Sequence, residues 1–243
     1  MTDTIETISH DSAQKELLSL TRTVKGQVLN AKNMYVEVDC KKPMPKQKIQ
    51  KTETQKSYKE LLNDLSCEVA ECQACPLSKT RNNVVFGDGN PEARLVFVGE
   101  APGADEDEQG LPFVGRAGQL LTNIIKAMGL ERKDVYICNI LKCRPPGNRN
   151  PLPEEIRLCE PFLKKQLRLI APQTICALGS FAAKTLLRTE TPITALRGRF
   201  HSYEGIPLMP TYHPAYLLRN PSAKKQVWDD VQLIMKEMSL KQS

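Results

Sequence analysis

Short apolar runs alternate with longer amphipathic segments over most of this 243-residue chain. The runs at residues 94–99 (RLVFVG), 134–141 (DVYICNIL) and 174–178 (TICAL) have the length and the β-branched content of buried strands. Strands that alternate with helices form a mostly parallel sheet with helices on both faces. We therefore predict an α/β fold, a three-layer α/β/α sandwich with a mostly parallel central sheet.

Helical spacing of apolar residues appears in five segments between and around these runs. Glu204-Gly205 separates two short apolar runs near the C-terminal end and predicts a hairpin turn. In parallel sheets of this kind, ligands bind beyond the carboxyl ends of the strands, so we look for chemistry there. The predicted helices are residues 57–71, 115–128, 153–170, 180–187 and 222–238.

The N-terminal part differs in composition from the rest. Residues 41–60 carry seven lysines against two glutamates and contain no sustained apolar run. Only a short helix around residues 12–21 is expected before them. We interpret residues 1–56 as a basic extension that we expect to be flexible, and residues 57–243 as the folded domain. A solvated tail is our main interpretation, and an arm that tethers DNA is the alternative.

The charge balance favours an anionic partner. The chain has 34 Lys and Arg against 28 Asp and Glu, a formal net charge of +6. No run approaches the ~20 apolar residues that cross a bilayer. The polar, acid-containing start argues against a secretory signal peptide. We expect a cytoplasmic protein without a membrane anchor.

Eight cysteines require an explanation in a reducing compartment, where closely spaced thiols indicate metal or cluster ligation. Cys72 and Cys75 form a CxxC pair before the first strand, Cys143 follows the second strand, and Cys159 falls in a predicted helix. Four thiolates suit zinc or an iron–sulfur cluster, and the spacing does not choose between them. The other four are interpreted as free thiols, the last two of them buried in strands: Cys40, Cys67, Cys138 and Cys176.

The first strand ends in a glycine-containing, acidic stretch, GEAPGADEDEQG, at residues 99–110. Its acids would repel phosphate, and it lacks the lysine of a P-loop. Carboxylates at a strand end are suited to activating water or stabilising a cation, although a solvated turn would have the same composition.

Three uncharged side chains add to this picture. Phe113 lies between a proline and a glycine-bounded helix start, where its ring could stack on a planar ligand or pack in the core. Asn139, near the end of the second strand, offers an acceptor and donors that match an imide edge. His213 follows the last strand; it could be a structural hydrogen-bonding residue or a donor to a developing anion.

Several arginines lie in loops where they could contact a phosphate backbone. Two of them belong to the proline-rich segment RPPGNRNP, which the cysteines before and after it would hold in place if they bind a metal centre. The candidates are Arg144, Arg149, Arg197, Arg199 and Arg219.

Taken in order, the segments GEAPGADEDEQG, PFVGRAG, CNILKCRPPGNRNP and PTYHPAYLLRNP resemble the motifs of the family 4 uracil-DNA glycosylases. These are iron–sulfur members of the uracil-DNA glycosylase superfamily. The resemblance covers about residues 70–238. A related family with covalent-trapping activity carries a KRRIH-like insertion near the second strand; here CRPPGNR stands there and RGRFH lies much later, so we reject that branch.

The resemblance implies a DNA repair glycosylase that flips uracil out of DNA and hydrolyses its N-glycosidic bond, leaving an abasic site. It implies Glu100 and His213 as catalytic residues, with Glu106 as the other candidate carboxylate. It also implies a uracil pocket made of Gly99, Glu100, Ala101, Gly103, Phe113, Asn139 and His213.

The resemblance further implies a [4Fe–4S] cluster held by Cys72, Cys75, Cys143 and Cys159. The implied partner is uracil-containing DNA, bound by a monomer whose N-terminal extension could meet a repair or replication protein. The residues alone leave another class open, a non-catalytic zinc-bound nucleic-acid-binding module. That class leaves Glu100, Asn139 and His213 unexplained. A third possibility is a glycosylase for other deaminated bases, because Gly103 leaves room beside the base.

Overall fold

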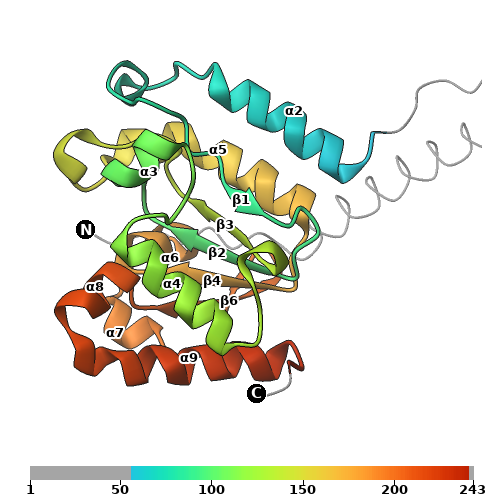
Figure 1. Cartoon of the computed structure of the whole chain (residues 1–243), viewed down its shortest axis with the longest axis vertical. Coiled ribbons are helices and arrows are strands. Elements are labelled where there is room, and N and C mark those ends of the chain that lie inside the picture. Colours follow the sequence, from blue (N-terminus) through green and yellow to red (C-terminus); the bar gives the residue numbers. More distant parts are fainter. Residues whose placement is uncertain (1–55, 241–243) are drawn as a thin grey trace, which may run out of the picture. The chain divides into compact units, whose positions relative to one another are not determined.

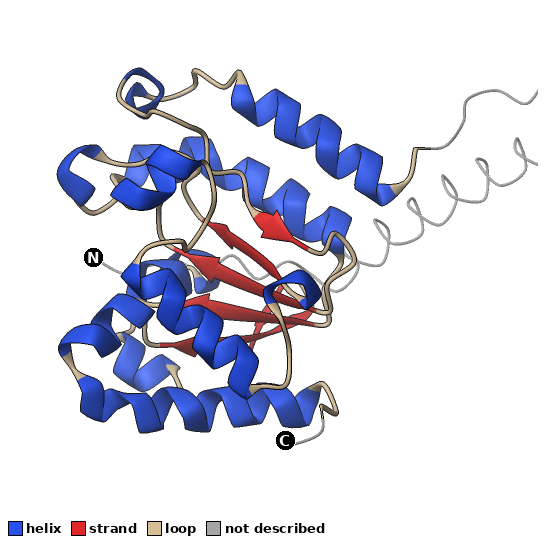
Figure 2. Cartoon of the chain, in the orientation of Figure 1, coloured by secondary structure: helices blue, strands red, loops and turns tan. Residues whose placement is uncertain are grey.

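The computed structural model describes residues 56–240. Three features considered above lie outside the described residues: the helix expected at 12–21, Cys40, and the N-terminal extension apart from Lys56. Within them the predicted three-layer α/β/α sandwich is confirmed, with helices on both faces of one sheet (Figures 1 and 2). The strands are β1 (Asp88–Gly89), β2 (Leu95–Gly99), β3 (Tyr136–Asn139), β4 (Thr174–Leu178), β5 (His201–Tyr203) and β6 (Ile206–Thr211).

The sheet has six strands in the order β1-β3-β2-β4-β6-β5. The four central strands are parallel, and the edge strands β1 and β5 pair antiparallel with β3 and β6. Every residue of β2, β3 and β4 is buried, as expected for strands covered on both faces. The carboxyl ends of the parallel strands therefore share one edge of the sheet.

The helices follow the periodicity of the sequence closely. The segments predicted at 153–170 and 180–187 begin and end where α5 and α6 do. Ser57 and Glu60 form a capping box that starts α2. The helices are α2 (Tyr58–Ala70), α3 (Ala104–Gln109), α4 (Arg116–Ala127), α5 (Pro153–Ile170), α6 (Ser180–Leu187), α7 (Ile193–Leu196), α8 (Pro214–Arg219) and α9 (Lys224–Glu237).

Two hydrophobic cores lie on the two faces of the sheet. Val96 and Val98 of β2 pack on the side of α5 and α6, whereas Leu95 and Phe97 pack on the side of α4 and α9. The alternation follows from the two-residue period of a strand. Each such side chain contributes roughly 1.5–3 kcal/mol when it is fully buried. The two cores hold the central strands, and so their carboxyl ends, in fixed positions.

Helix α3 is the main difference from the sequence prediction, because it forms where an acidic loop was expected. Its first turn carries Asp105, Glu106 and Asp107, and acids are favourable at the positive end of a helix. Asp107 is buried and accepts hydrogen bonds from the backbone amides of Asn82 and Asn83, at 2.9 and 3.3 Å. Asp107 therefore helps to hold the segment after β2, whereas Asp105 and Glu108 are exposed. None of the helices described is long and apolar enough to cross a membrane.

Candidate active site

One cavity of about 450 Å³ lies at the carboxyl ends of the parallel strands. It collects residues from the end of β2, the end of β3 and the segment after β6, which are far apart in the sequence. Of the predicted uracil-pocket residues, six line it: Glu100, Ala101, Gly103, Phe113, Asn139 and His213. The geometry thus brings together the side chains that the strand-end argument singled out.

Asn139 is buried to 1% exposure, and its side-chain oxygen Oδ1 has no hydrogen-bond partner among the described residues. An unpaired buried acceptor costs about 1–3 kcal/mol, so such an atom indicates a ligand donor. Asn139 lies beside Gly99 in the parallel pairing of β2 and β3. A Cβ at Gly99 would stand 2.3 Å from Asn139 Oδ1 and 2.6 Å from Phe113 Cζ. Gly99 therefore keeps space open between the amide and the ring.

If the chain carries out the uracil excision that the sequence resemblance implies, we expect Gly99→Ala to reduce its rate by about 10²-fold, because the added methyl group displaces Asn139 or Phe113 by about 1 Å. Single-turnover kinetics on the proposed substrate measure this. Gly205→Ala is the control: Gly205 has φ +86° in the β5–β6 turn, so alanine there strains the backbone without entering the cavity. Equal rates in the two variants would contradict the role of Gly99.

His213 and Phe113 both line the cavity, with ring centroids 5.5 Å apart. His213 caps α8, where its Nδ1 accepts a hydrogen bond from the amide of Ala215 at 3.1 Å. Burial lowers the pKa of His213 to about 4, so the imidazole is neutral at physiological pH. A neutral imidazole that accepts at Nδ1 carries its proton on Nε2. His213 can therefore donate from Nε2 to a ligand.

Glu100 follows the last residue of β2 and lines the cavity. Within the described part of the chain its carboxylate accepts no hydrogen bond from another residue. Burial raises the pKa of Glu100 to about 7. A carboxylate with a pKa near the working pH can both carry charge and take up a proton, which suits a general base.

The carboxylate of Glu106 is held by backbone amides. Its Oε1 accepts from the amides of Val114 and Gly115, at 2.9 and 3.0 Å, and its Oε2 accepts from the amide of Gly103 at 3.1 Å. A Cβ at Gly103 would stand 2.7 Å from Glu106 Oε2. Because both oxygens are engaged with backbone amides, Glu106 braces the two loops of the cavity, and Glu100 is left as the carboxylate that can reach water.

The five arginines named from the sequence lie in three different surroundings. Arg149 and Arg219 line the cavity, and Arg149 is held by a bidentate ion pair with Glu155. Arg197 instead pairs with the fully buried Asp230, at 2.8 and 3.0 Å. Because Asp230 engages two nitrogens of its guanidinium, we do not expect Arg197 to contact phosphate.

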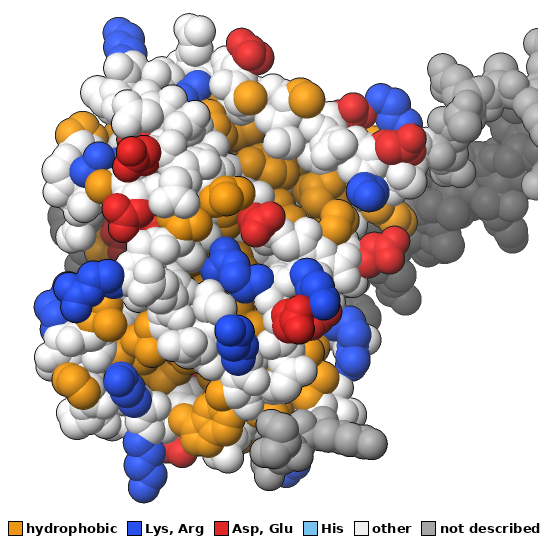
Figure 3. Space-filling model, in the orientation of Figure 1, with side chains coloured by type: hydrophobic (Ala, Val, Ile, Leu, Met, Phe, Trp, Pro, Cys, Tyr) orange, Lys and Arg blue, Asp and Glu red, His pale blue; other side chains and the backbone are white. Residues whose placement is uncertain are grey.

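The remaining two arginines lie outside the cavity. Arg144 donates to Asn148 at 2.7 Å, and Arg199 is exposed. On the face drawn in Figure 3, Lys and Arg side chains predominate over the lower half, where Figure 1 places α4, α8 and α9. This distribution would favour a polyanion near α8, which carries Arg219.

The four cysteines of the predicted cluster line one small pocket between the segment after α2, the end of β3 and α5: Cys72, Cys75, Cys143 and Cys159. Two donors face their sulfurs. Arg81 donates to Cys143 Sγ at 3.2 Å, and the amide of Lys142 donates to Cys159 Sγ at 3.4 Å. Burial raises the pKa of both thiols, that of Cys159 to about 11.

The donor set of this pocket is chemically suited to an iron–sulfur cluster. Four soft sulfur ligands are what such clusters require, and N–H donors beside the sulfurs tune a bound cluster. Among residues 56–240 no three His, Cys, Asp or Glu side chains are arranged to hold a metal ion. A tetrahedral zinc site needs its four sulfurs around one point, whereas a cluster binds each sulfur at a separate iron. By its ligand chemistry the four-thiolate set fits either group.

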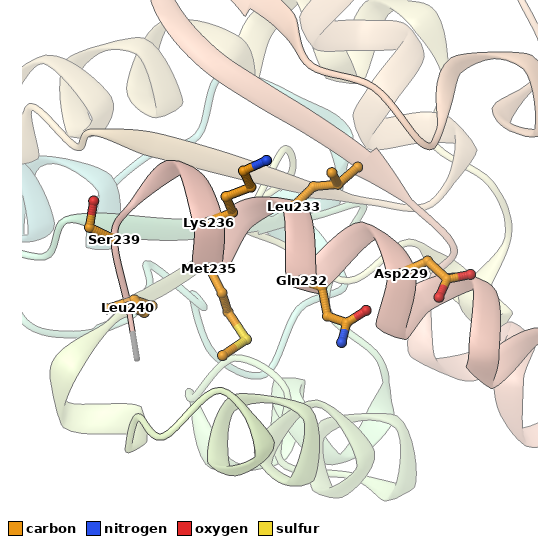
Figure 4. A pocket seen from close by; sticks show the side chains of 7 residues that line it. All are labelled: Asp229, Gln232, Leu233, Met235, Lys236, Ser239 and Leu240. Atoms are coloured by element: carbon orange, nitrogen blue, oxygen red, sulfur yellow. The ribbon is translucent and has the colours of Figure 1, made fainter. Parts of the chain in front are cut away.

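A second hollow lies along α9 (Figure 4). Its lining comes from this helix and the residues just after it, and no strand end reaches it. It brings together one carboxylate, Asp229, and one lysine, Lys236, with largely apolar neighbours. The strand-end cavity is therefore the candidate active site.

Comparison with known proteins shows which superfamily has this fold and site. The family model of the uracil DNA glycosylase superfamily matches residues 86–232, a range that contains Glu100, Asn139 and His213. The chain belongs to the uracil DNA glycosylase superfamily. The match covers all strands of the sheet from β1 to β6, so the superfamily assignment and the fold agree.

Within this superfamily the chain is similar to several type-4 uracil-DNA glycosylases, which confirms the resemblance read from the motifs. It is 48% identical over 177 residues to the protein of Thermotoga maritima, covering 71% of this chain and 92% of that one. It is 44% identical over 183 residues to the protein of Archaeoglobus fulgidus, covering 72% and 92%. The protein of Saccharolobus solfataricus is 42% identical over 189 residues, covering 74% and 88%.

Sequence reasoning missed some residues of the cavity. Tyr216 lines it from α8, is 39% exposed and lies against Tyr212, with ring centroids 4.9 Å apart. The sequence could have indicated Tyr216, because it is three residues after His213 and that spacing puts both side chains on one side of a helix start. Ala117, at the start of α4, carried no signal of its own.

Proposed function

We propose that this superfamily member removes uracil from DNA by hydrolysing its N-glycosidic bond, with Glu100, Asn139, His213 and Phe113 as the residues that act on the base and sugar. The observation that carries the proposal is the unpaired Oδ1 of buried Asn139. It faces the cavity that Glu100 and His213 also line. An acceptor without a donor, beside a carboxylate and a neutral imidazole, matches an imide base that leaves as an anion.

Uracil in a duplex is stacked and paired, so the nucleotide must first leave the helix at a cost of a few kcal/mol. The cavity offsets this cost through contacts that only an extruded base can make. Phe113 stacks on the ring, and base–aromatic stacking contributes about 1–3 kcal/mol. Asn139 accepts from N3–H through Oδ1 and donates to O4 through its amide nitrogen. Arg149 and Arg219, at the rim, contact phosphates.

The bond that breaks joins C1′ of the deoxyribose to N1 of uracil, and its electron pair leaves with the base. Negative charge then grows on the uracil ring, and Nε2–H of His213 donates to O2 to stabilise it. The sugar becomes oxocarbenium-like. Glu100 in its carboxylate form stabilises this cation and accepts a proton from the water that adds to C1′.

The cofactor proposed for the cysteine pocket is a [4Fe–4S] cluster bound by Cys72, Cys75, Cys143 and Cys159. Such a cluster would supply four strong cross-links among the segment after α2, the end of β3 and α5. Lys142, between Asn139 and Cys143, donates from its buried side-chain nitrogen to the backbone oxygen of Asn139 at 2.8 Å. The cluster would thereby stabilise the strand end that carries Asn139. Thiolate ligation also suits the reducing cytoplasm that we propose as the location.

The test of function uses purified protein and oligonucleotides that differ at one position, U, C or T, followed by alkali to cleave abasic sites. Strand breaks with U but not with C or T are expected. Absence of breaks at U in a correctly folded, iron-loaded protein would refute the proposal. Breaks at other deaminated bases would widen the substrate class. The non-catalytic module considered from the sequence predicts binding without breaks.

A further inference from the structure

The stacking residue Phe113 has a backbone conformation that needs an external cause. Its φ is +54°, in the left-handed region that side chains other than glycine rarely occupy. Such a conformation is unfavourable and persists only where the surroundings impose it. Without that constraint, relaxation of the backbone would move the ring, which lies at the edge of the proposed base site.

Arg132 contacts this strained segment from outside the cavity. One guanidinium nitrogen, Nη2, donates to the backbone oxygen of Pro112 at 2.8 Å, and Nη1 donates to the oxygen of Phe113 at 3.1 Å. Nη1 also lies 3.4 Å from Thr122 Oγ1 of α4. A planar guanidinium has the geometry to hold two neighbouring acceptors at once. Arg132 forms no ion pair within the described residues, so its donors serve the loop.

The other side of the same segment is also fixed. Glu106 accepts from the amides of Val114 and Gly115, the two residues after Phe113. At Gly118 of α4, a Cβ would stand 1.9 Å from the oxygen of Phe113, so the helix leaves a gap for that carbonyl. Arg132 thus holds the carbonyl groups of this segment, and Glu106 holds its amide groups.

We infer that Arg132 is a positioning residue for uracil recognition: by holding the carbonyls of Pro112 and Phe113 it fixes the Phe113 ring in the orientation that stacks on the extruded base. Arg132 does not line the cavity and touches neither base nor sugar. Its effect on the reaction passes through Phe113. The inference rests on the proposed function and adds to it the origin of the stacking geometry.

The test separates contacts to the base from contacts to the DNA backbone. Two DNA probes are used with full-length protein: one containing 2′-fluoro-2′-deoxyuridine, whose fluorine blocks bond cleavage, and one containing a tetrahydrofuran abasic-site analogue. Arg132→Met removes the donors and keeps an apolar chain. We expect it to weaken binding of the fluorouridine probe by about tenfold or more, because the ring that stacks on the base is no longer fixed. Binding of the abasic probe should stay at the wild-type level.

Arg94→Met is the matched control. Arg94 also donates to a backbone oxygen, that of Met238 at 2.8 Å, and to Gln173 Oε1 at 2.9 Å, beside the opposite end of β2. It should bind both probes like the wild type. If Arg132→Met is recovered unfolded, Arg132→Lys replaces it, because lysine keeps the charge and reaches one carbonyl; a smaller loss confined to the fluorouridine probe is then expected.

The inference is overturned if the Arg132 variant that folds binds both probes like Arg94→Met, or loses affinity for both probes equally. The wild-type protein is assayed for uracil excision in the same preparation. If the wild type excises no uracil, the proposed function fails. If the wild type excises uracil but the Arg132 variant does not lose affinity selectively for the fluorouridine probe, only the role of Arg132 fails.

Discussion

Glu100→Gln is expected to slow uracil excision by about 10²- to 10⁴-fold, the usual range for loss of a general base. Glutamine has the same size but neither carries charge nor accepts the proton of the attacking water. Because the pKa of Glu100 is raised to about 7, the wild-type rate should increase as the pH rises through 7 and the carboxylate forms. In Glu100→Gln this rise should disappear. Single-turnover rates between pH 5 and about 9 measure both effects.

Two further variants test whether the effect is specific to Glu100. Glu108→Gln, an exposed residue of α3, should leave rate and pH profile unchanged. Glu106→Gln keeps one acceptor oxygen for its backbone amides, so we expect a smaller loss than for Glu100→Gln, together with a lower free energy of unfolding. An unchanged rate in Glu100→Gln would remove Glu100 from the catalytic role.

Although Glu100→Gln should slow the reaction, it should increase the stability of the folded protein. The folded protein binds the Glu100 proton more tightly than the unfolded chain, so ionisation of Glu100 lowers the free energy of unfolding as the pH rises from 4.5 to 7. Glu100→Gln removes that loss. After allowance for solvent screening, we expect it to be more stable than wild type by about 1 kcal/mol at pH 8 and equal at pH 4. Urea unfolding at the two pH values measures this.

Cys143→Ser is expected to reduce the yield of folded protein, its iron content and its brown colour together. Cys143 follows β3 and would join it, through the cluster, to the segment after α2 and to α5. Helix α2 buries only three side chains, Leu62, Leu65 and Val69, so it depends on such links. Loss of a metal centre belongs to the mechanisms that cost about 4 kcal/mol or more.

The matched control is Cys67→Ser, an exposed cysteine on α2 outside the proposed ligand set. It should match the wild type in yield and in iron per chain. Iron analysis and thermal unfolding of the two variants provide the comparison. Normal stability of Cys143→Ser without iron would contradict a structural cluster.

The parts of the fold that could be predicted from the sequence are those with strong local periodicity. Helix α5 and strand β4 have the predicted ends, because proline and two glutamates begin the first and a continuous apolar run defines the second. The position of Gly99 and Asn139 at the carboxyl-end edge of the sheet also followed from the sequence, since parallel strands end at one edge, whereas their direct pairing did not. Cys138 and Cys176 are buried in strands as predicted.

The parts that could not be predicted depend on contacts between distant side chains. The pairing of Arg197 with Asp230 joins the segment after α7 to α9, and no local pattern distinguishes Arg197 from a free surface arginine. The role of Glu106 depends on the amides of Val114 and Gly115, which only the folded loop brings to it. Arg132 and Phe113 lie on either side of α4 in the sequence, and no sequence motif indicates that they are in contact.

The central claim is that three strand ends surround an extruded uracil and stabilise it as it departs. A crystal structure of the protein with free uracil tests this most directly. We expect the base to lie against Phe113, with the side chain of Asn139 facing N3–H and O4 and with Nε2 of His213 facing O2. An empty cavity at saturating uracil, with Asn139 and His213 turned into the apolar core, would contradict the account.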